Sequence, residues 1–316
     1  MFLDNLSELR RPKEVSEFFT NLNSTEQAEF IEDLINRTDN LTSEDAVAIC
    51  ILDTGVQNGH PLLANFLPDS NMYSWKADWG NIDNQPNGGH GTGMAGLALY
   101  GDLNPVLESS DRIQIFHQLE SVKILNQRDP NDPLLYGNIT EEACSTPIVD
   151  YPNRKRVYCL AVTANPTIDD ENSEYWGRPS SWSSAIDKIT FGEGEDKQLI
   201  FISGGNVNPQ KHSDYKTLNE TTSVEDPAQA FNAITVGAIT YFDRIDPVHS
   251  GYSLLANRGD LSPSSSTSLM WGKKWSVKPD IVLEGGNYAY NKYFATKLDS
   301  LQMLSTHSDY QNIPFQ

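Results

Sequence analysis

Asp53 and His90 are the two residues of this chain whose types and surroundings best suit chemistry. Asp53 ends the apolar run 47–52 and precedes a glycine turn, so we expect it at the carboxyl end of a buried strand. His90 is followed by Gly91-Thr92 and then by small and apolar residues through Leu99, which predicts a packed helix beginning at His90. A carboxylate and an imidazole at one end of an α/β sheet are the orienting group and the base of a nucleophilic triad.

The triplet Asp53-Thr54-Gly55 also suggests a different chemistry, because aspartic peptidases carry Asp-Thr-Gly at their catalytic carboxylates. Those enzymes need two such carboxylates that share a proton. The chain has one Asp-Thr-Gly, so it would have to dimerise, and single-motif protomers are much shorter than 316 residues. This alternative also leaves the motif around His90 unexplained, and we set it aside.

A third motif, Ser203-Gly204-Gly205-Asn206, follows the apolar run 199–202 and has the same design as the Asp53 segment. A neutral amide donor at a strand end, beside glycines that let a substrate carbonyl approach, suits an oxyanion site. Gly-Gly-Asn is also a common turn. The order Asp53, His90, Asn206 favours the functional interpretation.

Taken together, the motifs resemble those of the subtilisin-like (subtilase, S8-type) serine peptidases. Ile234-Thr235-Val236-Gly237-Ala238 resembles the strand after the oxyanion Asn of that family, and Lys278-Pro279-Asp280-Ile281 with Gly285-Gly286 resembles the segment before its nucleophile. The likeness covers roughly residues 45 to 290, with five motifs in family order. It implies a serine endopeptidase in which His90 is the general base and acid, Asp53 orients it, and Asn206 stabilises the oxyanion.

Two departures from the family pattern stand out. Gly93 occupies the place where subtilases often carry a second His, a position outside the triad. More seriously, no Gly-Thr-Ser follows Gly286, so the nucleophile Ser is not in this chain. The cluster from Ser262 to Ser268 precedes Lys278, where the family has a surface loop, and would require a different order of elements. We expect an inactive fragment that stops short of the nucleophile, by natural truncation or because it is a piece of a longer protein.

The second hypothesis is a non-catalytic peptide-binding or scaffolding module that keeps the peptidase fold. A peptide or protein substrate is the expected partner in either case, and further domains of a larger polypeptide are expected. By family likeness alone, the substrate-facing walls are the edge Leu125 to Asp129 and the segment 161–165.

Alternating strand-like and helix-like segments from residue 45 onward predict an α/β, three-layer fold: a mostly parallel sheet with helices on both faces. Residues 1–42 differ, since their apolar residues are spaced for two short helices, the second of which Ser24 could cap. We therefore divide the chain into an N-terminal helical segment or linker, 1–42, and a peptidase domain, 43–316. A short helix is also expected between Pro227 and Ile234.

The formal charge of −20 disfavours nucleic acid and anionic membranes as partners, and solubility explains it better than a preference for cationic substrates. No run approaches a membrane span. No cofactor is required and no metal site is expected; calcium is conceivable at Asp169-Asp170-Glu171, but the ligand spacing is irregular.

Three cysteines, Cys50, Cys144 and Cys159, form no CxxC pair, and an odd number of thiols fits a reducing compartment. With no signal peptide at Met1, this favours a cytoplasmic, bacterial intracellular location, with secretion open if the N-terminus was trimmed.

Overall fold

Seven parallel strands form the central sheet of the computed structural model, which describes residues 15–43, 45–85, 89–164, 177–192, 197–209, 214–271, 273 and 275–316. Most of these strands lie at the apolar runs that end at glycines or polar residues, where the sequence predicted strands. Their spatial order is β10 (Ile281–Glu284), β8 (Ile234–Ile239), β7 (Leu199–Ser203), β6 (Arg156–Leu160), β2 (Ala48–Asp53), β5 (Gln118–Lys123) and β3 (Met72–Ser74). The strands β2, β6 and β7 therefore lie side by side, and their carboxyl ends meet at one edge of the sheet.

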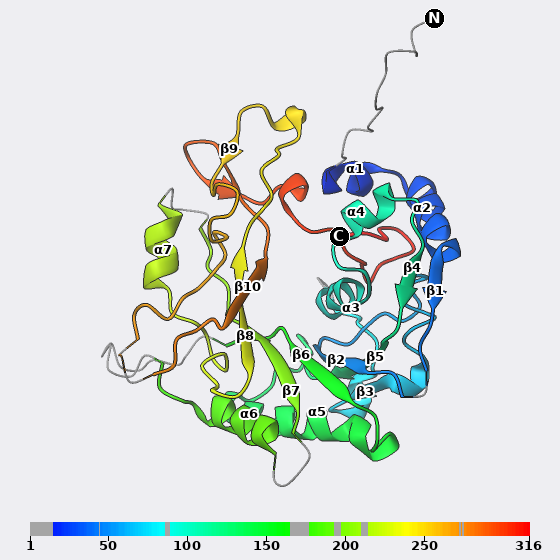
Figure 1. Cartoon of the computed structure of the whole chain (residues 1–316), viewed down its shortest axis with the longest axis vertical. Helices are drawn as coiled ribbons and strands as arrows, with labels where there is room; N and C mark the ends of the chain where they lie inside the picture. Colours follow the sequence, from blue (N-terminus) through cyan, green and yellow to red (C-terminus); the bar gives the residue numbers. More distant parts are fainter. Residues whose placement is uncertain are drawn as a thin grey trace, which may run out of the picture.

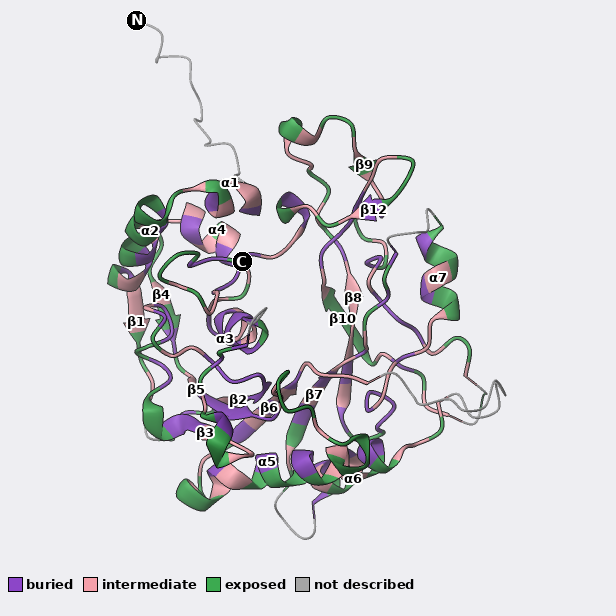
Figure 2. Cartoon of the chain, turned by 180° about the vertical axis from the view of Figure 1, so that it is seen from behind, coloured by how far each residue is buried: buried purple, intermediate pink, exposed green. Residues whose placement is uncertain are grey.

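Helices cover both faces of this sheet, which gives the expected three layers (Figure 1). The helix α3 (His90–Tyr100) packs on one face, and α5 (Tyr136–Asp150) and α6 (Ser181–Phe191) pack on the other. The side chains of β2 alternate between the two cores, with Cys50 and Leu52 toward α5 and α6 and Ile49 and Ile51 toward α3. Figure 2 shows β2 and β5 as buried strands, as expected for a parallel sheet covered on both sides.

The N-terminal residues fold as the two expected short helices, α1 (Ser16–Asn21) and α2 (Ser24–Asn36). The capping prediction was wrong by one residue, because Asn23 and not Ser24 caps α2. The Asn23 side chain accepts from the backbone amide of Glu26, and the Glu26 carboxylate accepts from the backbone amide of Asn23. A third apolar cluster joins both helices to α4 (Leu103–Glu108) and to the C-terminal residues Leu304 and Phe315.

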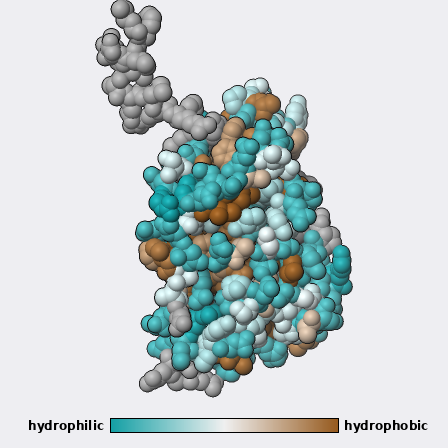
Figure 3. All heavy atoms as spheres, turned by 90° about the vertical axis from the view of Figure 1, so that its right-hand side faces the viewer, coloured by the Kyte–Doolittle hydropathy of each residue, from teal (hydrophilic) through white to brown (hydrophobic). Residues whose placement is uncertain are grey.

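A short parallel pair, β1 (Thr38–Asn40) with β4 (Ile113–Ile115), ties the chain after α2 to the main domain. The division of the chain at residue 42 remains a prediction. Residues on both sides of it share the β1–β4 pair and the third apolar cluster. Figure 3 shows that this side of the molecule is mainly hydrophilic, with small, separated hydrophobic patches. The apolar faces of α1 and α2 are thus used internally, in the third apolar cluster.

Residues 305–316 form a hairpin against the first turns of α3. Thr306 pairs with Phe315 across the hairpin, and the amide of Gln316 donates to the carbonyl of Ser305. The Ser305 hydroxyl donates to the carbonyl of Gly93 at 2.6 Å, and the Gln316 side chain donates to the carbonyl of Gly89 at 2.9 Å. The sequence motifs gave no indication of this hairpin.

Other segments also differ from expectation. The predicted helix between Pro227 and Ile234 is wrong, because this stretch forms turns in which Ala228, Ala230 and Ala233 are buried. The predicted loop 57–89 contains the edge strand β3. Elements that were not predicted include α7 (Tyr215–Thr221) and a small antiparallel sheet of β9 (Ser253–Leu254), β11 (Ala289–Tyr290) and β12 (Ala295–Thr296).

The cysteines are free thiols; Cys50 and Cys144 are buried and Cys159 is half-buried. Within the described part of the chain, no helix has the length and apolar character needed to cross a membrane.

Candidate active site

Asp53 lies at the carboxyl end of β2, where the sequence placed it. Its side chain is 1% exposed, and both of its carboxylate oxygens are engaged. Oδ1 accepts a hydrogen bond from the amide of Thr54 at 2.7 Å, and Oδ2 lies 2.8 Å from Nδ1 of His90. Because a carboxylate can only accept, Nδ1 of His90 carries the proton and Nε2 is the basic nitrogen. Within the described residues, Nε2 makes no hydrogen bond, and the His90 side chain is 57% exposed.

Two glycines and a small polar residue let α3 approach β2 closely. A Cβ on Gly91 would collide with the carbonyl of Gly55 and lie 3.2 Å from Cβ of Asp53. Thr92 is fully buried, and its hydroxyl accepts from the amide of Gln57 at 3.0 Å. The small size of Gly91 and Thr92 therefore serves the packing of α3 against β2. They make room for the turn that follows Asp53, which brings His90 within reach of it.

A second carboxylate, Asp83, holds the start of α3. Its Oδ2 accepts from the amide of Gly89 at 3.0 Å and from the hydroxyl of Thr92 at 3.0 Å, and the amide of Thr92 lies at 3.4 Å. These bonds satisfy amides that the first turn of a helix leaves without partners. Asp83 is 2% exposed, and burial raises the pKa of its carboxyl against the opposing effect of these hydrogen bonds. Sequence reasoning missed Asp83, since it sits in an irregular loop with no motif of its own.

The electrostatics of the site favour a charged imidazole. The hydrogen bond to Asp53 raises the pKa of His90 above its ordinary 6.5, and the negative charges of Asp53 and Asp83 act in the same direction. Burial opposes them. An imidazolium formed at Nε2 during proton transfer is thus stabilised in place.

Asn206 follows β7 at the same edge of the sheet, two strands from Asp53. It pairs with Ser265 as an isolated antiparallel bridge, its side chain is exposed, and its amide makes no hydrogen bond with a described residue. The side chain is free to donate, as predicted, although its role in catalysis remains a prediction. Gly205 before it has φ +96°, a conformation that favours glycine.

The serine cluster 262–268 is a buried loop rather than the surface loop that we expected. The hydroxyl of Ser262 donates to the carbonyl of Gly286 at 2.7 Å, and that of Ser266 donates to the carbonyl of Gly204 at 2.6 Å. The Ser265 hydroxyl accepts from the amide of Ala238 at 3.1 Å. These three side chains are no more than 2% exposed and join the ends of β7, β8 and β10. Their hydroxyls are bonded to backbone groups of the strand ends, and none of them is hydrogen-bonded to His90.

The two predicted walls enclose one cavity of about 200 Å³ near the carboxyl ends of β5 and β6. Leu125 comes from the first wall, and Val162, Thr163 and Ala164 come from the second, whereas Asn165 lies outside the described residues. The remaining lining residues are mostly apolar or aromatic: Ile124, Asn131, Tyr136, Ile139, Thr140 and Trp182.

The first wall is fixed at its outer end by Asp129. Its carboxylate accepts from Lys76 at 2.6 Å and from the indole of Trp79 at 2.8 Å. The Lys76 ammonium in turn lies 5.1 Å from the ring of Trp75 and 4.8 Å from that of Trp79, a cation–π arrangement. The position of this wall therefore depends on its contacts and not only on the loop backbone.

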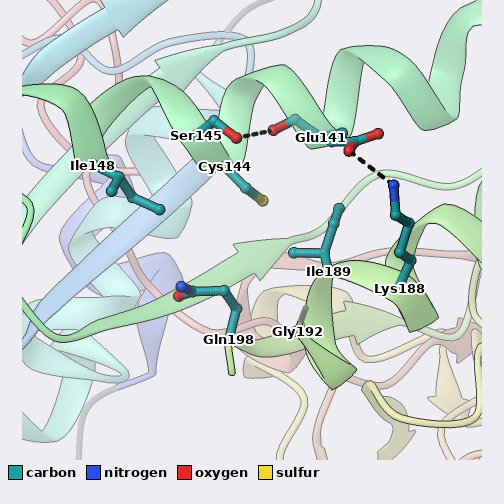
Figure 4. A pocket seen from close by; sticks show the side chains of 8 residues that line it. All are labelled: Glu141, Cys144, Ser145, Ile148, Lys188, Ile189, Gly192 and Gln198. Carbon is teal, nitrogen blue, oxygen red and sulfur yellow. Dashed lines mark hydrogen bonds and ion pairs between the residues drawn. The ribbon is translucent and has the colours of Figure 1, made fainter. Parts of the chain in front are cut away.

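A second cavity, of about 250 Å³, lies between α5 and α6 near the opposite edge of the sheet (Figure 4). Cys144 and Ser145 line it, but neither is suited to nucleophilic attack. Burial raises the pKa of the Cys144 thiol, and the Ser145 hydroxyl donates to the carbonyl of Glu141 at 2.8 Å. Lys188, which lies 3.6 Å from Glu141, is also paired. The charged side chains of this cavity, Glu141 and Lys188, are thus paired with each other.

The described residues contain no group of three or more His, Cys, Asp or Glu side chains placed to hold a metal ion. The calcium candidate Asp169-Asp170-Glu171 lies outside the residues that the structure describes, so the expectation about calcium stays untested.

The sequence matches the model of the subtilase family, Peptidase S8, over residues 44–316. The chain belongs to the subtilase family. It matches no curated protein.

Its fold is similar to those of solved proteases at low sequence identity. Sphericase is 18% identical with a TM-score of 0.49, and the match covers 86% of this subtilase and 79% of sphericase. The S41 psychrophilic protease is 19% identical with a TM-score of 0.47 and the same coverage. An epidermin leader peptide processing serine protease from Staphylococcus aureus is 16% identical with a TM-score of 0.47, covering 91% of this chain and 66% of its own.

Proposed function

We propose that this subtilase hydrolyses peptide bonds as a serine endopeptidase, with His90 as general base and acid, Asp53 as its orienting carboxylate and Asn206 as oxyanion donor. The observation that carries the proposal is the 2.8 Å bond between a buried carboxylate and an exposed imidazole whose other nitrogen has no partner among the described residues. Nδ1–H bonded to Asp53 leaves Nε2 to take a proton from a hydroxyl and return it to the leaving amine. Asn206, at the same sheet edge, donates to the negatively charged oxygen of the intermediate.

We place the nucleophilic serine outside these 316 residues. The serine cluster from Ser262 to Ser268 is the alternative source of a nucleophile. Three of its hydroxyls, however, are buried and hydrogen-bonded to backbone groups at the ends of β7, β8 and β10. On this proposal the 316-residue chain is inactive, because base and oxyanion donor without a nucleophile perform only part of the chemistry. Removing the serine of a subtilase costs about 10⁶-fold in turnover.

The exposure of β10, the outermost strand next to β8, supports the idea that a further segment of the polypeptide packs on this strand. Parallel sheets are normally covered on both faces. In β10, however, Ile281 is 41%, Val282 39% and Leu283 58% exposed. We propose that the segment carrying the serine covers these side chains in the active polypeptide.

The experiment compares the 316-residue chain with a polypeptide extended through the serine, using a fluorogenic peptide mixture as substrate. Hydrolysis by the extended form that falls by about 10⁶-fold in His90→Ala supports the proposal. An extended form that binds peptides without cleaving them, or that carries another residue in place of the serine, identifies a peptide-binding module instead.

A further inference from the structure

Glu225 occupies the gap between the chain segments that follow β6 and β7. The hydroxyl of Thr163, three residues after β6, donates to Oε2 of Glu225. On the other side, a Cβ placed on Gly205 would lie 2.6 Å from both Cγ and Oε2 of Glu225. Gly205 thus leaves room for a carboxylate, in addition to its need for a positive φ.

The place of this carboxylate follows from the order of the strands. Gly205 immediately precedes Asn206, the proposed oxyanion donor, and β6 lies between β7 and the Asp53 strand β2. A substrate carbonyl bound at Asn206 brings the side chain of the same residue next to Gly205 and Thr163. Among the described residues, Glu225 is a charged group that lies against both of these segments, at Thr163 and at Gly205.

The surroundings leave the charge of Glu225 uncompensated. Glu225 is half-buried, makes no ion pair with any described residue, and its Oε1 has no hydrogen-bond partner among them. The neighbouring acid differs, because the Asp226 side chain accepts from the amide of Gln229 at 2.9 Å and from the hydroxyl of Ser180 at 2.5 Å. A half-buried carboxylate without a cation is stabilised by any ammonium or guanidinium that can reach it.

We propose that Glu225 selects substrates with lysine or arginine at the residue whose carbonyl is attacked, by pairing with that side chain. This inference rests on the proposed peptidase function and adds the substrate class to it. A guanidinium or ammonium at Glu225 replaces the missing cation, while an acidic side chain at the same place is repelled.

The test uses the active, serine-containing polypeptide and a set of fluorogenic peptides that differ only at the residue before the cleaved bond: Arg, Lys, Leu or Glu. Wild type is expected to prefer Arg and Lys. Glu225→Gln keeps the shape and the acceptor for Thr163 but removes the charge. It is expected to lower kcat/KM for Arg and Lys by on the order of 10- to 100-fold, with Leu unchanged, as for loss of a partly buried ion pair. Glu225→Lys should reverse the order and favour Glu.

Glu220→Gln is the matched control, because it removes the same charge from the exposed face of α7 and should leave the preference unchanged. A wild-type preference for Leu, or an equal fall of all four substrates in Glu225→Gln with an unchanged unfolding transition, overturns the role of Glu225. Failure of the proposed peptidase function has a different signature: no hydrolysis of any peptide that depends on His90.

Discussion

Asp53 and His90 share one hydrogen bond of 2.8 Å but differ sharply in exposure, at 1% and 57% of their side chains. The carboxylate is buried at the end of β2, whereas the imidazole is exposed at the start of α3. A general base such as His90 must be accessible to the nucleophile whose proton it takes, whereas the carboxylate that orients it needs to contact only the imidazole. The asymmetry therefore matches the division of labour that a triad requires.

Replacing Asp53 by Asn should lower the pKa of His90 in the 316-residue chain itself, because the hydrogen bond to Asp53 is the largest cause of its elevation. His90 must be neutral to act as a base, so in the active polypeptide kcat/KM should fall as the pH drops through this raised pKa. Asp53→Asn should cut kcat by about 10⁴-fold, through loss of the correct tautomer. NMR titration of the ring and a pH–rate profile measure the two effects. Asp39→Asn, which removes a half-buried acid paired with Arg112, serves as control. An unshifted pKa of His90 in Asp53→Asn would speak against the assignment.

Asn206→Ala should reduce turnover of the active polypeptide by ~10²–10³-fold with little change in KM, which is the usual loss of one oxyanion donor. Steady-state kinetics on a single peptide substrate measures it. Since the Asn206 side chain is exposed and makes no hydrogen bond within the described residues, the variant should keep its unfolding midpoint. Unchanged turnover in Asn206→Ala would contradict the oxyanion role and leave Asn206 with a structural role in the turn.

Asp83→Ala should lower the free energy of unfolding by about 1–3 kcal/mol, because it leaves the amides of Gly89 and Thr92 without acceptors in a buried setting. Urea titration gives the value. Asp214→Ala, which removes an exposed acid that caps α7, should cost less. Hydrogen exchange at the first turn of α3 should accelerate in Asp83→Ala alone. If both variants unfold at the same urea concentration, Asp83 does not hold the helix.

His60 should make the fold sensitive to acid. It is fully buried, Nε2 donates to the carbonyl of Pro314 at 3.0 Å, and Nδ1 accepts from the amide of Leu62 at 3.2 Å, so the ring is neutral. Burial, with His307 adding to it, lowers its pKa from 6.5 to about 4. Between these values the unfolded chain binds more protons than the folded one. Stability should therefore fall as pH drops from 6.5 to 4, by about 3 kcal/mol from this group.

The measurement is urea unfolding of wild type and His60→Gln at pH 7, 5.5 and 4.5. Glutamine can keep the bond to Pro314 but cannot titrate, so the variant should lose less stability on acidification than wild type. Parallel pH dependences of the two proteins would argue against a buried neutral His60.

The sequence predicted the parts of the site whose signals are local. Asp53 and His90 stand inside continuous apolar and glycine-rich patterns, and β2 and α3 formed where those patterns lie. Asp83 could not be found this way, because its importance arises from a loop that folds back onto α3. The alanine-rich stretch after Pro227 favoured a helix by local propensity. Burial in the core and the bond from the Thr235 hydroxyl to the carbonyl of Ala228 instead stabilise turns.

Long-range contacts account for the remaining differences. The hairpin 305–316 is fixed by hydrogen bonds to Gly89, Thr92 and Gly93, more than 200 residues away in the chain. Gly93 lies against the same hairpin: a Cβ there would meet the end of the Gln316 side chain, which would have to shift. Such tertiary constraints leave no periodic pattern in the sequence.

The central claim, that Asp53 and His90 activate a serine outside residues 1–316, is tested most directly by labelling with a fluorophosphonate, which modifies activated serines. The extended polypeptide, its His90→Ala variant and the 316-residue chain are treated in parallel, and the labelled residue is located by mass spectrometry. We predict one labelled serine beyond Gln316 in the extended form and no labelling in the other two. Labelling of the 316-residue chain at any serine from Ser262 to Ser268, or undiminished labelling in His90→Ala, would contradict it.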